Sequence, residues 1–475
     1  MGARCEAFFE RMGRTLRNKK QRASFALYAS GLLSTAERKS AEPIVALSCT
    51  EPGEMDAAHQ RLLHFLGESS WDDRAVRLAA TRYALEQIEK NDIVEAWIID
   101  DTGFLKKGSH SVGVQRQYTG SAGKVTNCQV GVSLTLATQA HHVAADFELY
   151  LPETWANNRE RRLEARIPPH VVFKTKPELA LEMIERAVEA KLPRGLVLAD
   201  SAYGDCSDFR ATLRAWELDY AVGVSKTIRL LPVSRDGQVA TQAVTAHELS
   251  EGLTFRRVTW RQGTAGPLSA RFAFAKVVPA HEDGWKPEER EAVHLVCEWR
   301  AGEDEPRFHL TSLPVDRLAN VYVVRMLKQR WRTERVYQDL KEELGLDHYE
   351  GRRFQGWHHH VSVVLSCYAF IAAERAAFSP CGDDDGGDDD DGGDDDGGDD
   401  DFGLDFNSSA SAGWAEQTGQ DAERRIPHPL STSSRTPRRR LDYDIASVLH
   451  AQRTTLASAM PYLPDFPCPT GEPAQ

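Results

Sequence analysis

The chain has 475 residues, of which 41% are hydrophobic and 27% are charged, so it can hold two or three domains with a large core. Its formal net charge is -13 at pH 7. Residues 383–401 are 13 aspartates and 6 glycines, so this one tract accounts for the whole net charge and the rest of the chain is neutral. An acidic total therefore does not exclude a polyanionic partner. The 8 cysteines form no Cys-x-x-Cys pair, which argues against a zinc site or a disulfide framework.

We predict no membrane partner from the sequence. The N-terminus lacks a signal-peptide pattern, and the longest apolar run, residues 361–373, is too short to span a bilayer. We interpret this run as part of a buried helix. A soluble protein of the cytoplasm is the expectation.

Residues 1–92 are predicted to form a helical domain. Residues 1–40 carry nine lysines and arginines against three glutamates, and apolar residues recur at helical spacing. Trp71 is followed by two aspartates that suit the first turn of a further helix, which runs to about residue 90. The basic excess suits contact with DNA, although a solvated basic face explains the same pattern.

Residues 93–225 read as a mixed α/β sheet. The apolar run 95–103 predicts a buried strand with Asp100 and Asp101 near its end, and the short strand 195–200 ends in Asp200. Further strands are predicted over 128–137, 143–151 and 220–224, and helices over 176–191 and 208–218. Strand ends of this kind form the edge where open α/β sheets bind ligands. An aspartate after a strand is also a common turn residue, so each one alone has a structural explanation.

Residues 226–315 interrupt this alternation and predict an all-β insertion. Strands are expected over 253–260, 269–278, 292–299 and 307–310. Helix resumes over 318–343, and a buried helix follows over 356–377, which completes a segment 316–378. The three consecutive histidines, 358–360, point in different directions on a helix, so packing or DNA contact is favoured over metal binding.

The helix around residues 330–341 places charged residues on one side. Arg330, Glu334, Gln338 and Lys341 share a face at about 100° per residue, together with Leu327. An amphipathic helix with a solvated charged edge explains this pattern without any function. Because carboxylates also stand at the ends of two predicted strands, metal binding is a second explanation for Glu334.

Three carboxylates from two strand ends and a helix suit divalent metal binding. Magnesium prefers oxygen ligands and combines a few carboxylates with substrate phosphates. Two such ions about 4 Å apart would promote in-line phosphoryl transfer. Arg330 and Lys341 could then neutralise the phosphates of a bound strand, whereas without phosphate they would pair with Glu334.

Several separated motifs resemble one family. Asp-Thr-Gly at 101–103, Ala-Asp-Ser-Ala-Tyr-Gly-Asp at 199–205 and Arg-Trp-Arg-Thr-Glu at 330–334, with Lys341 seven residues later, occur in this order. They resemble the DDE transposases of bacterial insertion sequences, in the branch with a Tyr-Arg-Glu-Lys signature on the last catalytic helix. Leu327 stands where that signature has tyrosine. The stretches 101–131 and 345–352 are also similar to this family, and the resemblance covers about residues 8–378.

This resemblance implies an RNase H-like core in which Asp101, Asp200 and Glu334 bind two magnesium ions, with manganese as a substitute. Asp100 competes for the first position, and Asp101 is preferred because it directly precedes Thr-Gly. The β-rich segment would be the insertion that such enzymes place before the glutamate. The helical N-terminus would help to recognise terminal inverted repeats, and a homodimer would cut both ends of double-stranded DNA and join the 3′-hydroxyls to target DNA.

Other functions stay open at this point. One is a catalytically inactive, domesticated DNA-binding protein derived from such a transposase, and a second is a metal-dependent nuclease that cuts without joining. A two-carboxylate sugar hydrolase lacks support, because no aromatic sugar platform is evident. Residues 379–475, which contain the Asp/Gly tract and a basic Pro-rich tail, are predicted to be disordered.

Overall fold

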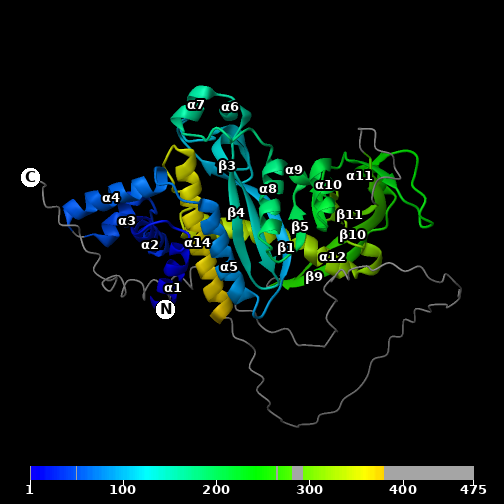
Figure 1. Cartoon of the computed structure of the whole chain (residues 1–475). Coiled ribbons are helices and arrows are strands. Elements are labelled where there is room, and N and C mark those ends of the chain that lie inside the picture. Colours follow the sequence, from blue (N-terminus) through cyan, green and yellow to red (C-terminus); the bar gives the residue numbers. More distant parts are fainter. Residues whose placement is uncertain (1, 50, 264–265, 281–291, 379–475) are drawn as a thin grey trace, which may run out of the picture. The chain divides into compact units, whose positions relative to one another are not determined.

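The computed structural model of the chain describes residues 2–49, 51–263, 266–280 and 292–378 (Figure 1). The prediction of disorder over residues 379–475 lies outside the described residues.

The N-terminal part consists of helices α1 (Gly2–Gly13), α2 (Lys19–Leu33), α3 (Ala41–Ser48), α4 (Pro52–Gly67) and α5 (Asp73–Ile88). Local capping explains where two of them begin. Asn18 accepts a hydrogen bond from the backbone N–H of Gln21, and Asp72 accepts one from that of Ala75. The predicted helix after Trp71 is therefore α5, with Asp72 as its cap.

A sheet in the strand order β4-β3-β1-β5-β6 forms the core. Its strands are β1 (Val94–Leu105), β3 (Lys124–Thr138), β4 (His142–Tyr150), β5 (Leu196–Ala199) and β6 (Tyr220–Val224). Strands β1, β3 and β4 are antiparallel neighbours, and β5 and β6 run parallel to β1. This is the RNase H-like mixed sheet that the sequence predicted. The short apolar strands β5 and β6 are fully buried, as expected of parallel strands covered on both faces.

The two faces of this sheet are covered by different helices. Ile98 of β1 packs with Val323 and Leu327 of α12 (Asn320–Leu327), and we call this side the α12 face. Ile99 belongs to the larger core that also contains Met183 of α8 (Lys176–Glu189), and we call that side the α8 face. Because side chains alternate along a strand, Asp100 points to the α12 face and Asp101 to the α8 face.

The β-rich segment continues the same sheet. It contains β7 (Arg229–Pro232), β8 (Val244–Thr245), α11 (Ala246–Glu251), β9 (Arg256–Gly263), β10 (Gly266–Pro279), β11 (Val293–Trp299) and β12 (Arg307–Thr311). The four predicted strands correspond to β9–β12, and β12 pairs antiparallel with β6. The expectation of an all-β segment was wrong at α11, where a capping box between Thr245 and Glu248 begins a short helix.

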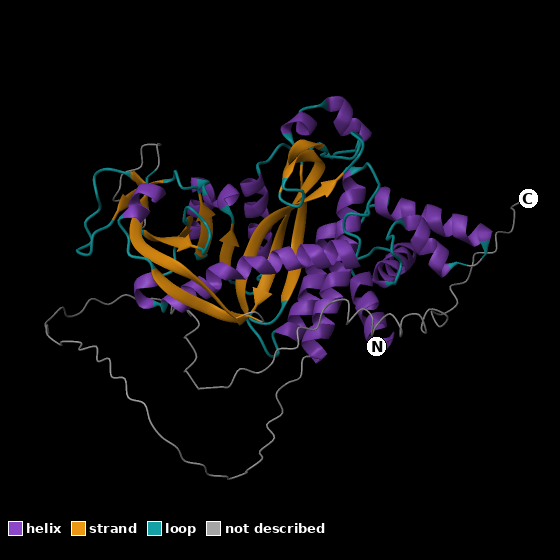
Figure 2. Ribbon diagram, turned by 180° about the vertical axis from the view of Figure 1, so that it is seen from behind, coloured by secondary structure: helices purple, strands orange, loops and turns teal. Residues whose placement is uncertain are grey.

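The remaining short elements are β2 (Gln115–Thr119), α6 (Glu153–Ala156), α7 (Arg159–Glu164), α9 (Ser201–Gly204), α10 (Ser207–Ala215) and the 3-10 turn η2 (Val315–Arg317). The helix predicted over 318–343 is a helical run of four parts. Helix α12 is followed by the 3-10 turn η3 (Lys328–Arg330), by α13 (Trp331–Gln338) and by the π turn η4 (Asp339–Glu343). Figure 2 shows this run crossing the sheet.

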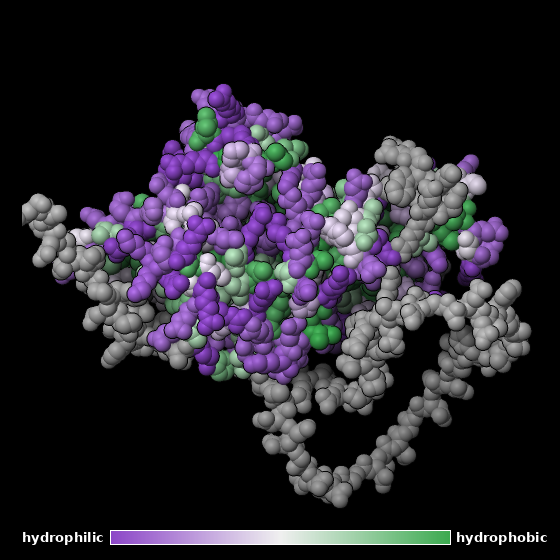
Figure 3. Space-filling model, in the orientation of Figure 1, coloured by the Kyte–Doolittle hydropathy of each residue, from purple (hydrophilic) through white to green (hydrophobic). Residues whose placement is uncertain are grey.

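Helix α14 (Phe354–Phe378) is the buried helix that the apolar run predicted. It is long and apolar enough to cross a membrane by length and composition, but it is mostly buried inside the protein and packs against α2, α4, α5 and β4. The face of the molecule in Figure 3 is mainly hydrophilic, with small separate hydrophobic patches. Helix α14 is therefore a core helix.

Candidate active site

Asp100 and Asp200 lie side by side at the ends of neighbouring parallel strands. Ile98 of β1 is paired with Leu198 of β5, and the same register two residues further brings Asp100 beside Asp200. The pKa of Asp100 is raised to about 6, mainly by burial and additionally by the negative charge of Asp200. The two carboxylates are therefore close enough to repel each other.

Arg330 is the cation next to Asp100. Its Nη2 lies 3.5 Å from Asp100 Oδ2, and its charge opposes the rise in the pKa of Asp100. Its Nε is buried and has no hydrogen-bond partner among the described residues. A buried donor without an acceptor is costly, so this atom suits an acceptor from outside the chain, such as a phosphate oxygen.

Two hydroxyl contacts hold α13 on β3. The hydroxyl of Thr333 donates to Thr135 Oγ1 over 2.9 Å, and the hydroxyls of Tyr337 and Ser133 are 2.6 Å apart. Ser133 is the cross-strand neighbour of Asp100. These contacts therefore fix the helix against the strand next to that carboxylate.

Glu334 extends from α13 one helical turn after Arg330. It is exposed, and it forms no ion pair or hydrogen bond with any described residue. Nowhere in the described ranges do three or more His, Cys, Asp or Glu side chains converge closely enough to hold a metal ion. The structure thus brings Asp100 and Asp200 together. Glu334 lies on the adjoining helix, and the three carboxylates do not form a closed metal site.

The donor set nevertheless fits a divalent cation. Asp100, Asp200 and Glu334 offer the carboxylate oxygens that magnesium prefers. A bound cation would offset both the burial of Asp100 and its repulsion by Asp200, which together raise the pKa of Asp100.

Asp101 has a partner on the opposite side of the sheet. Lys176, the first residue of α8, places Nζ 3.0 Å from Asp101 Oδ2, and the hydroxyl of Tyr203 donates to the same oxygen over 3.4 Å. Asp101 therefore lies on the α8 face, whereas Asp100 lies on the same face as Arg330. The Thr-Gly motif identifies the strand end, but the strand register decides which of two adjacent side chains faces α13.

The π turn η4 directs Lys341 to the end of β1. Its Nζ donates to Thr102 Oγ1 over 2.7 Å and to the carbonyl oxygen of Gly103 over 2.9 Å. Burial lowers the pKa of Lys341. The predicted phosphate contact of Lys341 is not tested by this arrangement. Leu327, where the family signature has tyrosine, is buried with Ile98 on the α12 face.

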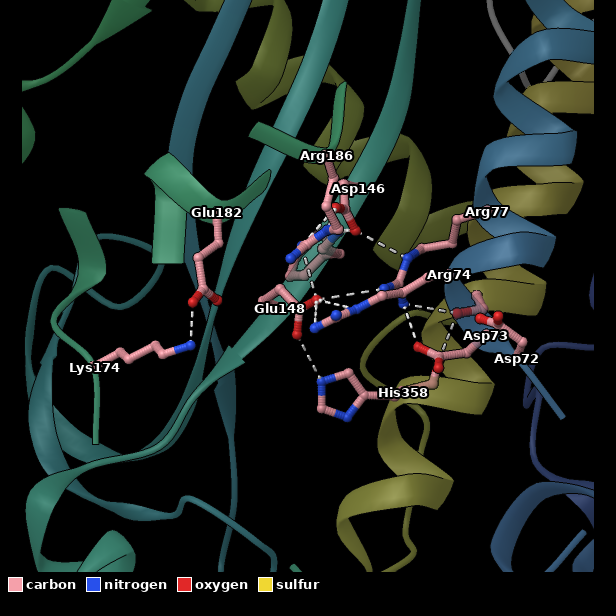
Figure 4. A network of polar contacts seen from close by, with 12 residues as sticks. Asp72, Asp73, Arg74, Arg77, Asp146, Glu148, Lys174, Glu182, Arg186 and His358 are labelled. Carbon is pink, nitrogen blue, oxygen red and sulfur yellow. Dashed lines mark hydrogen bonds and ion pairs between the residues drawn. The ribbon is translucent and has the colours of Figure 1, made fainter. Parts of the chain in front are cut away.

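A second cluster of carboxylates and arginines, which was not predicted from the sequence, lies on the α8 face (Figure 4). We call Asp146, Glu148, Arg77, Arg186 and His358 the buried ion network. Arg77 Nε lies 3.0 Å from Asp146 Oδ1, and Arg186 Nη2 lies 2.7 Å from Asp146 Oδ2 and 2.9 Å from Glu148 Oε1. His358 Nε2 lies 3.2 Å from Glu148 Oε2. The network connects α5, α8, α14 and β4.

Charge balance keeps this network ionised although it is buried. Burial alone would raise the pKa of Glu148, but the hydrogen bond and charge of His358, with Arg77 and Arg186, hold it well below its usual value. The sequence signal was the pair Asp146 and Glu148 on one side of an otherwise apolar strand. Buried charges of this kind need partners.

His359 and His360, the other two histidines of this run in α14, are packing residues. His359 stacks on Trp71 with ring centroids 3.7 Å apart, and His360 Nδ1 lies 2.9 Å from the hydroxyl of Tyr28. Burial lowers the pKa of His359 and His360 to about 4, so both rings are neutral at pH 7. These contacts agree with the predicted packing role.

Comparisons with known proteins agree on one family. A family model described as DDE superfamily endonuclease matches residues 11–267, and one described as transposase DDE domain matches residues 174–370. The chain is 33% identical over 176 residues to a probable transposase for insertion sequence element IS701 from Microchaete diplosiphon, covering 36% of this chain and 43% of that protein. The matched region thus spans less than half of this relative's length.

Among solved structures, the chain is similar to a cryo-EM structure of piggyBac transposase in a synaptic complex with hairpin DNA. The two chains share 9% sequence identity with a TM-score of 0.36, over 75% of this chain and 66% of that one. The family model that matches residues 11–267 covers more than half of the chain. The chain therefore belongs to the DDE superfamily of endonucleases.

Proposed function

We propose that this protein is a transposase that cuts double-stranded DNA at the terminal inverted repeats of an insertion sequence and joins the freed 3′-hydroxyls to target DNA. The observation that carries the proposal is the pairing of Asp100 with Asp200 beside the helix that bears Arg330 and Glu334. Membership of the DDE superfamily supports the same reaction class. The part of the relative that matches is too short to transfer its activity directly.

Asp100, Asp200 and Glu334 are the proposed ligands of two magnesium ions, with manganese as a substitute. Such ions supply Lewis-acid activation of the phosphodiester and of the attacking hydroxyl. Asp101 is assigned instead to holding Lys176, with which it already pairs. This assignment follows the side of the sheet on which each carboxylate lies.

The neighbouring residues position the DNA and the helix. Arg330 faces the carboxylates with an unsatisfied buried Nε, which suits it to a phosphate oxygen next to the scissile bond. Thr333 and Tyr337 hold α13 on β3, so that Glu334 keeps its place relative to Asp100. Lys341 holds the end of the helical run on β1, and a contact of Lys341 with DNA remains a further proposal.

Hydrolysis breaks one phosphodiester and leaves a 3′-hydroxyl on the element end. That hydroxyl then attacks a target phosphodiester, so one bond forms as another breaks. Synapsis of two ends calls for a homodimer on DNA, and the basic helical N-terminus is the proposed reader of the repeats. A soluble protein acting in the cytoplasm is consistent with the burial of α14.

The test is magnesium-dependent cleavage of DNA that carries the two ends flanking the coding region. Wild type should cut at the ends, Asp200→Ala should not, and Asp208→Asn should behave as wild type. Asp208 is a suitable control because it is an exposed aspartate in the first turn of α10. Binding to the ends without cleavage by wild type would contradict the proposal and identify a catalytically inactive DNA-binding descendant.

A further inference from the structure

The hairpin of β2 and β3 is anchored at the end of β1, three residues after Asp100. A methyl group on Gly103 would meet Thr119 Oγ1 at 2.1 Å, so the absence of a side chain lets the hairpin approach. The hydroxyls of Thr119 and Ser121 are 2.9 Å apart, and Ser121 Oγ donates to the carbonyl oxygen of Gly103 over 3.3 Å. Lys341 donates to the same carbonyl. The Gly103 carbonyl of β1 therefore accepts hydrogen bonds both from the hairpin and from the helical run that bears Glu334.

The hairpin presents an exposed apolar pair on the α12 face. Thr102 lies on the same face as Asp100 and is paired with Gly131 of β3. Because side chains alternate along a strand, every second residue of β3 from Gly131 towards the hairpin tip lies on this face, and Val125 is one of them. Tyr118 stands opposite Val125, and their exposures are 63% and 54%. Single exposed apolar residues are ordinary, but here two are adjacent, on a fixed hairpin and on the side of Asp100.

The charge of the hairpin segment itself favours a polyanion. Between Asp101 and Asp146 the sequence contains four lysines and arginines and no acidic residue. Arg116 and Lys124 flank the pair, are exposed, and form no ion pair with any described residue. Arg116 is two residues from Tyr118 and so lies on the same side of the hairpin.

We propose that this hairpin face binds the DNA held at the candidate active site. Tyr118 stacks on a base of the DNA that extends past the candidate active site, Val125 packs beside it, and Arg116 contacts a phosphate. Aromatic stacking tolerates any base, so this contact positions the strand without reading its sequence. The inference rests on the proposed function for the location of the DNA, but its binding test does not require cleavage.

The experiment compares variants of the full chain by fluorescence anisotropy. The probe is a labelled duplex that carries one DNA end flanking the coding region and a short stretch of unpaired bases beside that end, in EDTA so that no strand is cut. Tyr118→Ala should weaken binding about tenfold, because loss of one stacked base has roughly this effect. Tyr118→Phe should bind within about twofold of wild type, because the ring is retained.

Two controls separate the outcomes. Val321→Ala removes a side chain of comparable exposure, 49%, from α12 and should leave binding unchanged. The oligomeric state of every variant is measured by light scattering. Equal binding by Tyr118→Ala and wild type, or no binding by wild type, would overturn the inference. So would a loss of dimers with unchanged affinity per protomer, which would make the hairpin a contact between two copies of the chain.

Failure of the proposed function would look different. If wild type binds the duplex and Tyr118→Ala weakens that binding, the inference stands. Absence of magnesium-dependent cleavage by the same wild-type protein would then refute only the catalytic proposal.

Discussion

The two faces of the central sheet carry clusters of carboxylates and arginines that are built in opposite ways. In the buried ion network on the α8 face, each carboxylate has at least two cationic partners, and the cluster is closed. On the α12 face, Arg330 is the one cation within 4.0 Å of Asp100, Asp200 or Glu334 among the described residues, and it contacts Asp100 alone.

This difference separates a structural cluster from a candidate reactive one. Balanced charges keep the network ionised, because His358, Arg77 and Arg186 lower the pKa of Glu148 against the effect of burial. Burial, together with the negative charge of Asp200, raises the pKa of Asp100, and the surplus negative charge leaves a place for a cation and a phosphate. The predictions below test whether the two clusters respond to mutation in these different ways.

The largest effect is expected from removing a carboxylate on the α12 face. Asp200→Asn and Glu334→Gln should each lower DNA cleavage about a thousandfold, equivalent to roughly 4 kcal/mol of activation free energy. Their free energies of unfolding should stay near that of wild type, because the Glu334 side chain has no described partner and Asp200 only caps the short helix α9. Single-turnover cleavage and urea unfolding measure the two quantities. Full cleavage by either variant would remove that residue from the site.

The next largest effect concerns the buried ion network. Arg77→Met should lower the free energy of unfolding by about 3–5 kcal/mol, because it removes a fully buried cation that pairs with Asp73, Asp146 and Glu148 and leaves a surplus of buried negative charge. Arg74→Met is the matched control, because Arg74 is largely exposed and contacts the same Glu148 at 2.9 Å. That substitution should lower the free energy of unfolding by less than about 1 kcal/mol. Equal effects of both substitutions in urea unfolding would contradict the structural role of the network.

A smaller change in the free energy of unfolding, this time a stabilisation, is expected from replacing Asp100. Its pKa is about 6 in the folded protein and near 3.8 when unfolded, so the folded state holds the proton more tightly. Ionised Asp100 therefore destabilises the fold above pH 6, and this cost disappears as the pH falls from 6 to about 4. Asp100→Asn should stabilise the protein by about 2 kcal/mol at pH 7 and by much less near pH 4. Destabilisation at pH 7 would contradict the raised pKa of Asp100 in the folded protein.

The smallest effect is stabilisation by the metal itself. Magnesium at about ten times its dissociation constant should stabilise the native state by about 1.4 kcal/mol, and EDTA should reverse this. Asp200→Asn should abolish the thermal shift, whereas Asp208→Asn should retain it. A shift of equal size in both variants would place the cation elsewhere.

The sequence predicted the elements of the core well, because each depends on local periodicity. The apolar runs that became β1 and β5, and the aspartates that end them, are visible without a structure. The buried helix α14 was equally plain from its composition. Glu334 was placed on a helix by its apolar neighbours.

Features that depend on distant residues could not be read in this way. The choice between Asp100 and Asp101 depends on the register of β1 against β5, and no local motif reports that register. Arg77 and Glu148 meet across a sequence separation of about seventy residues. The π turn that directs Lys341 to Thr102 interrupts a helix whose sequence pattern is continuous.

The most direct test of the account compares the two adjacent aspartates of β1. Asp100→Asn and Asp101→Asn are assayed for magnesium-dependent cleavage of the DNA ends, under conditions in which both variants are folded. The account predicts that Asp100→Asn loses cleavage about a thousandfold, and that Asp101→Asn, which changes only the contacts with Lys176 and Tyr203 on the α8 face, stays within about tenfold of wild type. Retained cleavage by Asp100→Asn together with its loss in Asp101→Asn would contradict the assignment of the α12 face as the active site.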